Sequence, residues 1–125
     1  MKAIKGGKII LKDRVIEGFA LLYTDVIEGI VPEDKIPEKA EVIDAAGGYV
    51  SPGLIDIHIH GYLGKDVCDG EEESIRTISK GLLANGVTGY LPTTMTVDMK
   101  VIKKALEVCR SLKEESKNWD GCQIL

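Results

Sequence analysis

The sequence has few aromatic side chains, no long apolar run and no excess of positive charge. Its 125 residues include one Phe, one Trp and four Tyr, and the formal net charge is −4. Without a basic surface, nucleic acid is not expected as a partner. No apolar stretch approaches the roughly 20 residues of a membrane helix, and the first ten residues do not resemble a signal peptide. We therefore expect a cytoplasmic protein that does not contact a membrane.

Cysteine is also scarce. The three residues Cys68, Cys109 and Cys122 are odd in number and show no CxxC spacing, which argues against a disulfide framework or a zinc knuckle. Cys109 falls on the apolar stripe of a predicted helix and is expected to be a small core residue.

Residues 1–50 have the pattern of short strands and turns. The Gly6-Gly7 pair between two apolar segments suits a tight hairpin, and a polar loop from Pro32 to Glu41 precedes another short strand. This pattern predicts a small antiparallel β module. Because so few aromatic residues are present to fill its core, the module is expected to need further strands from elsewhere.

Residues 51–125 alternate between strands and helices, which predicts an α/β fold. The strand LIDIHI is followed by a helical segment from Asp69 to Gly86, with Asp69 and Glu72 as a capping box. A second strand ends at Pro92, a second helix follows, and CQIL begins a third strand. Such units form parallel strands with right-handed crossovers. Two and a half units cannot close a TIM-type (β/α)8 barrel of about 250 residues, so we expect the incomplete start of a larger architecture.

The two histidines of the chain, His58 and His60, lie two residues apart on the first of these strands. Side chains alternate with period two along a strand, so both should share one face with Asp56, while Ile55, Ile57 and Ile59 share the face that packs under the helices. The pair also lies at the carboxyl end of the strand, where barrel enzymes place their active sites.

The histidine pair allows two interpretations. A histidine in a strand is most often a hydrogen-bonded core or surface residue, but the shared face and the position at the strand end favour metal ligation. Asp56, deeper along the strand, is interpreted as a structural residue or one that supports the ligands.

Other marked features have simpler explanations. Thr93 and Thr94, after Pro92, either line a substrate cavity or turn the chain into the next helix, and the structural role is favoured. The acidic run Glu71 to Glu73 is interpreted as first-turn helix charge. Trp119 is expected to pack at the end of the second helix.

The segment VIDAAGGYVSPGLIDIHIHG resembles the amidohydrolase superfamily, whose first barrel strand carries a Pro-Gly-x-(Ile/Leu)-Asp-x-His-x-His motif. Within it, HIHGYLGKD and LLANGVTGYLPTTMT are similar to the N-acetylglucosamine-6-phosphate deacetylase family. The resemblance implies that residues 1–50 are part of a composite β-sandwich and that residues 51–125 begin the barrel. It implies His58 and His60 as ligands of a divalent metal ion, zinc or iron, with one or two ions in each active site.

The function implied by this resemblance is metal-dependent removal of acetate from N-acetylglucosamine 6-phosphate. The catalytic general acid and base, and the remaining ligands, are expected beyond Leu125. The chain alone is therefore expected to be inactive, and the complete protein is expected to be a homodimer. Alternatives are another amidohydrolase acting on a cyclic amide, imide or aminopurine-type compound, or a non-catalytic domain that associates through exposed β edges.

Overall fold

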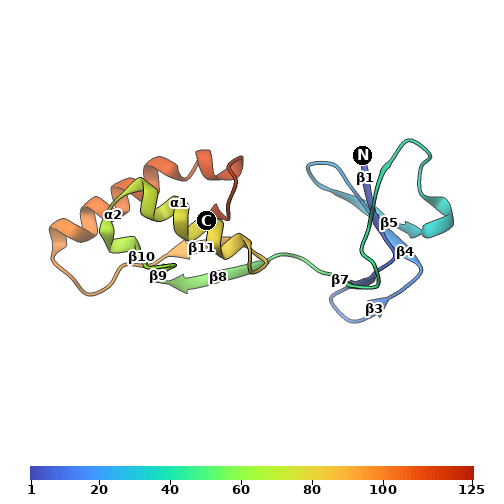
Figure 1. The fold of residues 1–125 in the computed structure, drawn as a ribbon, viewed down its shortest axis with the longest axis horizontal. Coiled ribbons are helices and arrows are strands. Elements are labelled where there is room, and N and C mark those ends of the chain that lie inside the picture. Colours follow the sequence, from blue (N-terminus) through green and yellow to red (C-terminus); the bar gives the residue numbers. More distant parts are fainter. The chain divides into compact units, whose positions relative to one another are not determined.

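The computed structural model describes residues 1–125 and divides into two compact units, Met1–Pro52 and Gly53–Leu125. The helices are confined to the second unit apart from one short 3-10 turn, η1 (Glu33–Lys35). None of the helices is both long enough and apolar enough to cross a membrane. Figure 1 shows the strands and helices of each unit.

The first unit consists of two small sheets of mixed direction. The four-stranded sheet has the order β5-β4-β1-β6 and the three-stranded sheet the order β3-β2-β7. The strands are β1 (Lys2–Lys5), β2 (Lys8–Ile10), β3 (Val15–Ile16), β4 (Phe19–Tyr23), β5 (Ile27–Pro32), β6 (Glu41–Asp44) and β7 (Tyr49–Val50). The pairs β1/β6 and β2/β7 are parallel. The prediction of a purely antiparallel module is therefore wrong.

The Gly6-Gly7 pair forms a corner between the two sheets, so the predicted hairpin is also wrong. Strand β1 pairs with β4 and β6, whereas β2 pairs with β3 and β7. Gly6 has φ +66°, and a Cβ there would collide with the Asp44 carboxylate. A glycine pair permits positive φ in a corner as readily as in a hairpin, and the parallel partner strand turns the same corner through Ala46 and Gly47, both at positive φ.

The buried side chains of the first unit are few and small. Ala3, Ile9, Ala20 and Leu22 are its buried apolar residues. An apolar groove of about 280 Å³ remains open beside Ile9, with Leu21, Ile27 and Ile30 among its lining residues. The shortage of large core residues that the sequence indicates is thus visible in the structure as an unfilled surface.

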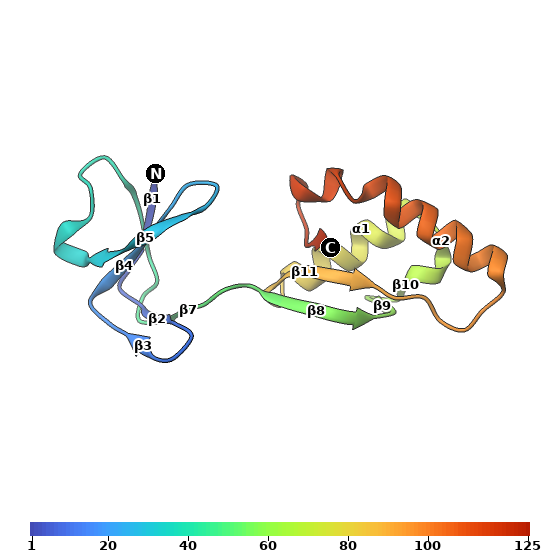
Figure 2. The same ribbon diagram turned by 180° about the vertical axis from the view of Figure 1, so that it is seen from behind.

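The second unit is built on three parallel strands in the order β12-β11-β8. Both views show its two helices on the same side of β8 and β11 (Figures 1 and 2). The elements are β8 (Leu54–Ile59), β9 (Gly61–Tyr62), β10 (Lys65–Asp66), η2 (Val67–Asp69), α1 (Glu72–Leu83), β11 (Val87–Pro92), α2 (Met99–Leu112), η3 (Glu115–Lys117) and β12 (Gln123–Ile124). The strand–helix–strand–helix–strand order agrees with the sequence pattern.

The helices bury most of the stripes that their periodicity predicts, although Ile102 of α2 is half-buried and two leucines are exposed. In α1, Ile75, Ile78 and Leu82 are buried, and in α2 the buried residues are Ala105, Cys109 and Leu112. Leu83 and Leu106 were expected on these stripes but are exposed. At about 100° per residue each lies roughly 90–110° from the centre of its buried stripe, at the margin that the sheet does not cover.

Two local expectations about the second unit are corrected. Asp69 does not cap α1, because the chain first forms η2: its carboxylate accepts the N–H of Asp66 (3.0 Å) and the hydroxyl of Ser74 (2.8 Å). Of the three isoleucines of β8, only Ile59 packs against the core. Ile55 and Ile57 are 53% and 72% exposed, because β8 is an edge strand and no helix covers that part of it.

Tyr90 is the largest fully buried side chain, and its hydroxyl lies 2.9 Å from that of Ser79. Burial raises the pKa of Tyr90 from 10.0 to about 12, and the Ser79 hydrogen bond opposes this shift. The folded state therefore holds the phenol proton more tightly than the unfolded chain. The resulting stability is fully present below about pH 10 and is lost as the pH rises through about 12.

We expect Tyr90→Phe to cost about 1 kcal/mol at neutral pH, because the buried Ser79 hydroxyl loses its partner, and to flatten the alkaline loss of stability. Urea unfolding of both proteins between pH 8 and about 12 measures the effect. Parallel stability curves for the parent and the variant would show that Tyr90 does not carry the alkaline loss.

Candidate metal centre

The two histidine rings converge at the carboxyl end of β8. The Nε2 atoms of His58 and His60 are 3.3 Å apart, the ring centroids are 5.0 Å apart, and the rings are nearly perpendicular at 88°. His58 is exposed and His60 is half-buried. Period-two alternation along the strand places both rings on one side, as the sequence indicates.

The end of β11 orients His60. Its Nδ1 lies 3.0 Å from the carbonyl oxygen of Thr93, and the Thr93 N–H donates to the Ile59 carbonyl at 2.9 Å. The Thr93 hydroxyl donates to the Leu91 carbonyl at 3.1 Å, which supports the structural role favoured for this threonine. The contact of the Thr93 carbonyl with His60 was missed from the sequence, because a backbone carbonyl leaves no mark in residue identity.

Asp56 serves the backbone of β8 instead of the rings. Its Oδ1 accepts the N–H of His58 at 3.0 Å. This bond satisfies a donor on the exposed edge of the strand, which would otherwise be open to pairing with another chain.

The geometry of the pair fits a shared ion. Two nitrogen ligands about 2.1 Å from one ion at tetrahedral angles lie about 3.4 Å apart, close to the 3.3 Å between the two Nε2 atoms. No cluster of three or more His, Cys, Asp or Glu side chains suited to a metal occurs in the chain. Two histidines alone would be an incomplete zinc site, because zinc sites in proteins use at least three protein ligands.

The segment after His60 is fastened to α1. Strands β9 and β10 form a hairpin, and the Tyr62 hydroxyl accepts from Asn85 Nδ2 at 3.0 Å. The hairpin packs on Gly81, where an added Cβ would lie 2.7 Å from the Tyr62 ring and 2.6 Å from Leu63.

A second contact ties η2 to the loop after β11. The backbone N–H of Met95 donates to the Sγ of Cys68 at 3.2 Å. The other two thiols are buried, and burial raises the pKa of Cys122 to about 11 and raises that of Cys109. Buried protonated thiols of this kind are structural and not reactive.

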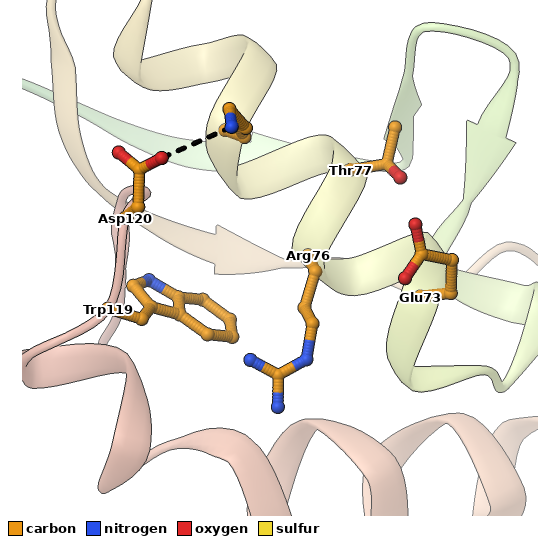
Figure 3. Close-up of a pocket in the computed structure, with 6 residues that line it drawn as sticks. Glu73, Arg76, Thr77, Trp119 and Asp120 are labelled. Carbon is orange, nitrogen blue, oxygen red and sulfur yellow. Dashed lines mark ion pairs between the residues drawn. The ribbon is translucent and has the colours of Figure 1, made fainter.

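A cavity of about 250 Å³ lies elsewhere, against α1, and Figure 3 shows its lining. Both of its cations are already paired. Arg76 makes two hydrogen bonds to Glu115 (2.9 and 2.8 Å) and lies 5.2 Å from the Trp119 ring centre, and Lys80 is 3.1 Å from Asp120. These contacts fasten η3 and the residues that follow it to α1, so the cavity lies within a set of structural contacts.

Comparison with known proteins relates the chain to hydrolases of carbon–nitrogen bonds. It is 34% identical over 125 residues to N-acetylglucosamine-6-phosphate deacetylase from Bacillus subtilis, covering 98% of this chain and 32% of that enzyme. The crystal structure of N-acetylglucosamine-6-phosphate deacetylase from Pasteurella multocida superposes with a TM-score of 0.87 at 29% identity, covering 94% of this chain and 31% of that one. D-Hydantoinase from Thermus sp. gives a TM-score of 0.60 at 30% identity, covering 89% and 24%. No family model matches the chain.

The mixed α/β fold and these similarities place the chain among relatives of amidohydrolase-type enzymes. More narrowly, the chain is a homologue of N-acetylglucosamine-6-phosphate deacetylases. It spans about a third of the length of the Bacillus subtilis enzyme.

The close packing of Tyr62 on Gly81 gives a testable prediction. Alanine is favoured over glycine in a helix by about 1 kcal/mol, but overpacking costs typically 1–3 kcal/mol. We expect Gly81→Ala to destabilise the chain by about 1 kcal/mol and to shift the NMR resonances of the hairpin. In a background that carries both Tyr62→Ala and Leu63→Ala, the same substitution should be neutral or stabilising, because both close neighbours are then removed. Equal effects of Gly81→Ala in both backgrounds, measured by urea unfolding, would contradict this packing.

Proposed function

We propose that this chain supplies two metal ligands, His58 and His60, and the first strands of a barrel-type N-acetylglucosamine-6-phosphate deacetylase. The observation that carries the proposal is the 3.3 Å separation of the two Nε2 atoms, held by a hydrogen bond on the far side of the His60 ring. Metal-ligating histidines commonly donate their second ring N–H to a carboxylate or a backbone carbonyl.

The barrel part of the proposal rests on the parallel sheet and its uncovered residues. Leu54 and Ile57 on β8 are 62% and 72% exposed, and Leu91 on β11 is 41% exposed. Parallel sheets normally have both faces covered. Further strands and helices of a (β/α)8 barrel would cover these positions, with residues 51–125 as its start and residues 1–50 as part of a composite β-sandwich.

Divalent metal ions in such enzymes make a hydroxide nucleophile available near neutral pH and polarise the amide carbonyl. In this chain, His58 and His60 would hold the ion, zinc or iron, and the Thr93 carbonyl would orient His60. The general acid and base, and further ligands, would come from outside these residues. From the resemblance alone we also propose one or two ions in each site, a homodimer and a cytoplasmic location.

The deacetylase is favoured over a cyclic amidase by the structural comparison. The deacetylase from Pasteurella multocida superposes with a TM-score of 0.87, whereas the D-hydantoinase gives 0.60 at nearly equal identity. Hydrolysis of a cyclic amide or imide is the second candidate, because the hydantoinase similarity still covers 89% of the chain.

Metal binding tests the ligand assignment. We expect the parent chain to bind Zn²⁺ weakly in isothermal titration, because only two ligands are present. Either single variant, His58→Ala or His60→Ala, should lose about tenfold or more in affinity, because loss of a ligand costs at least as much as loss of a group that supports one. Thr94→Ala, which leaves both rings in place, is the control. Equal Zn²⁺ binding by the parent and the double histidine variant would refute the assignment.

A chimera tests the reaction. Replacing the matching third of the Bacillus subtilis deacetylase with this chain should give an enzyme that releases acetate from N-acetylglucosamine 6-phosphate and does not open hydantoin. The same chimera with His58→Ala and His60→Ala should show at least about a hundredfold lower turnover, because two ligands are lost. A folded chimera that hydrolyses only hydantoin would favour the second candidate.

A further inference from the structure

The hydrogen bond at the end of β11 determines which nitrogen of His60 carries the proton. A carbonyl oxygen can only accept, so the Nδ1 atom that lies 3.0 Å from the Thr93 carbonyl must be the protonated one. In the neutral ring the other nitrogen, Nε2, then carries the lone pair. His60 therefore presents an acceptor toward His58.

The state of His60 determines that of His58 in turn. Their Nε2 atoms are 3.3 Å apart, and His60 Nε2 is the acceptor of this contact. In a neutral pair, His58 must donate through an Nε2–H. His58 Nδ1 makes no hydrogen bond within the chain, and its ring is exposed. The two rings are thus unequal: one is fixed by the fold and the other is free to change.

The Thr93 carbonyl is itself held in place from several sides. The Thr93 N–H donates to the Ile59 carbonyl at 2.9 Å, and its hydroxyl donates to the Leu91 carbonyl at 3.1 Å. Pro92, the residue before Thr93, has its φ fixed by its ring. The loop after Thr93 is restrained by the hydrogen bond that the Met95 N–H donates to Cys68 Sγ.

We propose that the Thr93 carbonyl is the positioning group of the histidine pair. It keeps His60 in the Nδ1–H tautomer with its Nε2 lone pair ready for a ligand, while His58 changes tautomer to bind. The tautomer assignment stands on geometry alone, and its consequence for metal binding rests on the proposed function. We therefore expect His60 to contribute more than His58 to binding of the metal ion.

The test uses the fact that the chain has only two histidines. Long-range ¹H–¹⁵N NMR of the parent chain labelled with ¹⁵N-histidine, at a pH where both rings are neutral, reports each tautomer directly, and His58→Gln assigns the signals. We expect His60 as the Nδ1–H tautomer and His58 as the Nε2–H tautomer. A predominant Nε2–H tautomer at His60, or an even mixture, would overturn the proposal.

An amide-to-ester change isolates the carbonyl. Replacing residue 94 by its α-hydroxy acid converts the Thr93–Thr94 amide into an ester and weakens the Thr93 carbonyl as an acceptor. The Thr94 N–H that is lost makes no hydrogen bond in the chain. The matched control is the same change at residue 96, because neither the Met95 carbonyl nor the Thr96 N–H is hydrogen bonded.

We expect the ester at residue 94 to lower the ratio of the Nδ1–H to the Nε2–H tautomer of His60 by about fivefold or more. It should also lower the Zn²⁺ affinity about tenfold. The control ester at residue 96 should change neither quantity. Equal tautomer ratios in the two esters would overturn the positioning role. If the tautomers respond as expected but no form of the chain binds Zn²⁺, the positioning role holds and the proposed metal site fails.

Discussion

The hydrogen bond from the Thr93 N–H to the Ile59 carbonyl joins the carboxyl ends of β8 and β11, and the candidate site depends on it. One residue further along β8, the same threonine contacts the His60 ring through its carbonyl. Pairing of the strands and orientation of the His60 ring therefore both depend on one residue, Thr93. Any change in the register of β11 against β8 would move the carbonyl away from the ring.

The sequence was sufficient for features that follow from periodicity. Alternation along β8 brought His58 and His60 together, and the helical period identified the buried faces of α1 and α2. The sequence was insufficient where one residue pattern is compatible with two different backbone structures. Gly6-Gly7 permits positive φ in a hairpin and in a sheet corner alike, and only the partner strands decide between them. The η2 turn and the Thr93 carbonyl depend on backbone contacts between distant residues, which no local pattern records.

The two units differ in how well their residues cover one another. The second unit encloses Tyr90 together with two isoleucines and a leucine of α1 under its helices. In the first unit, two of the four buried apolar residues are alanines, which bury little apolar area and so add little to stability. The first unit therefore has the smaller buried apolar core of the two.

The contact between the two histidines satisfies a partly buried polar group at the candidate site. A half-buried imidazole without partners would carry a desolvation cost, but both nitrogens of His60 have one, the Thr93 carbonyl and His58 Nε2. The rings can therefore hold their convergent geometry before any ion arrives. In the proposed metal site, His58 would be the ring of this pair that rearranges, because the fold fixes the His60 ring and leaves His58 exposed. The ordering cost of bringing the pair to an ion would then fall on His58.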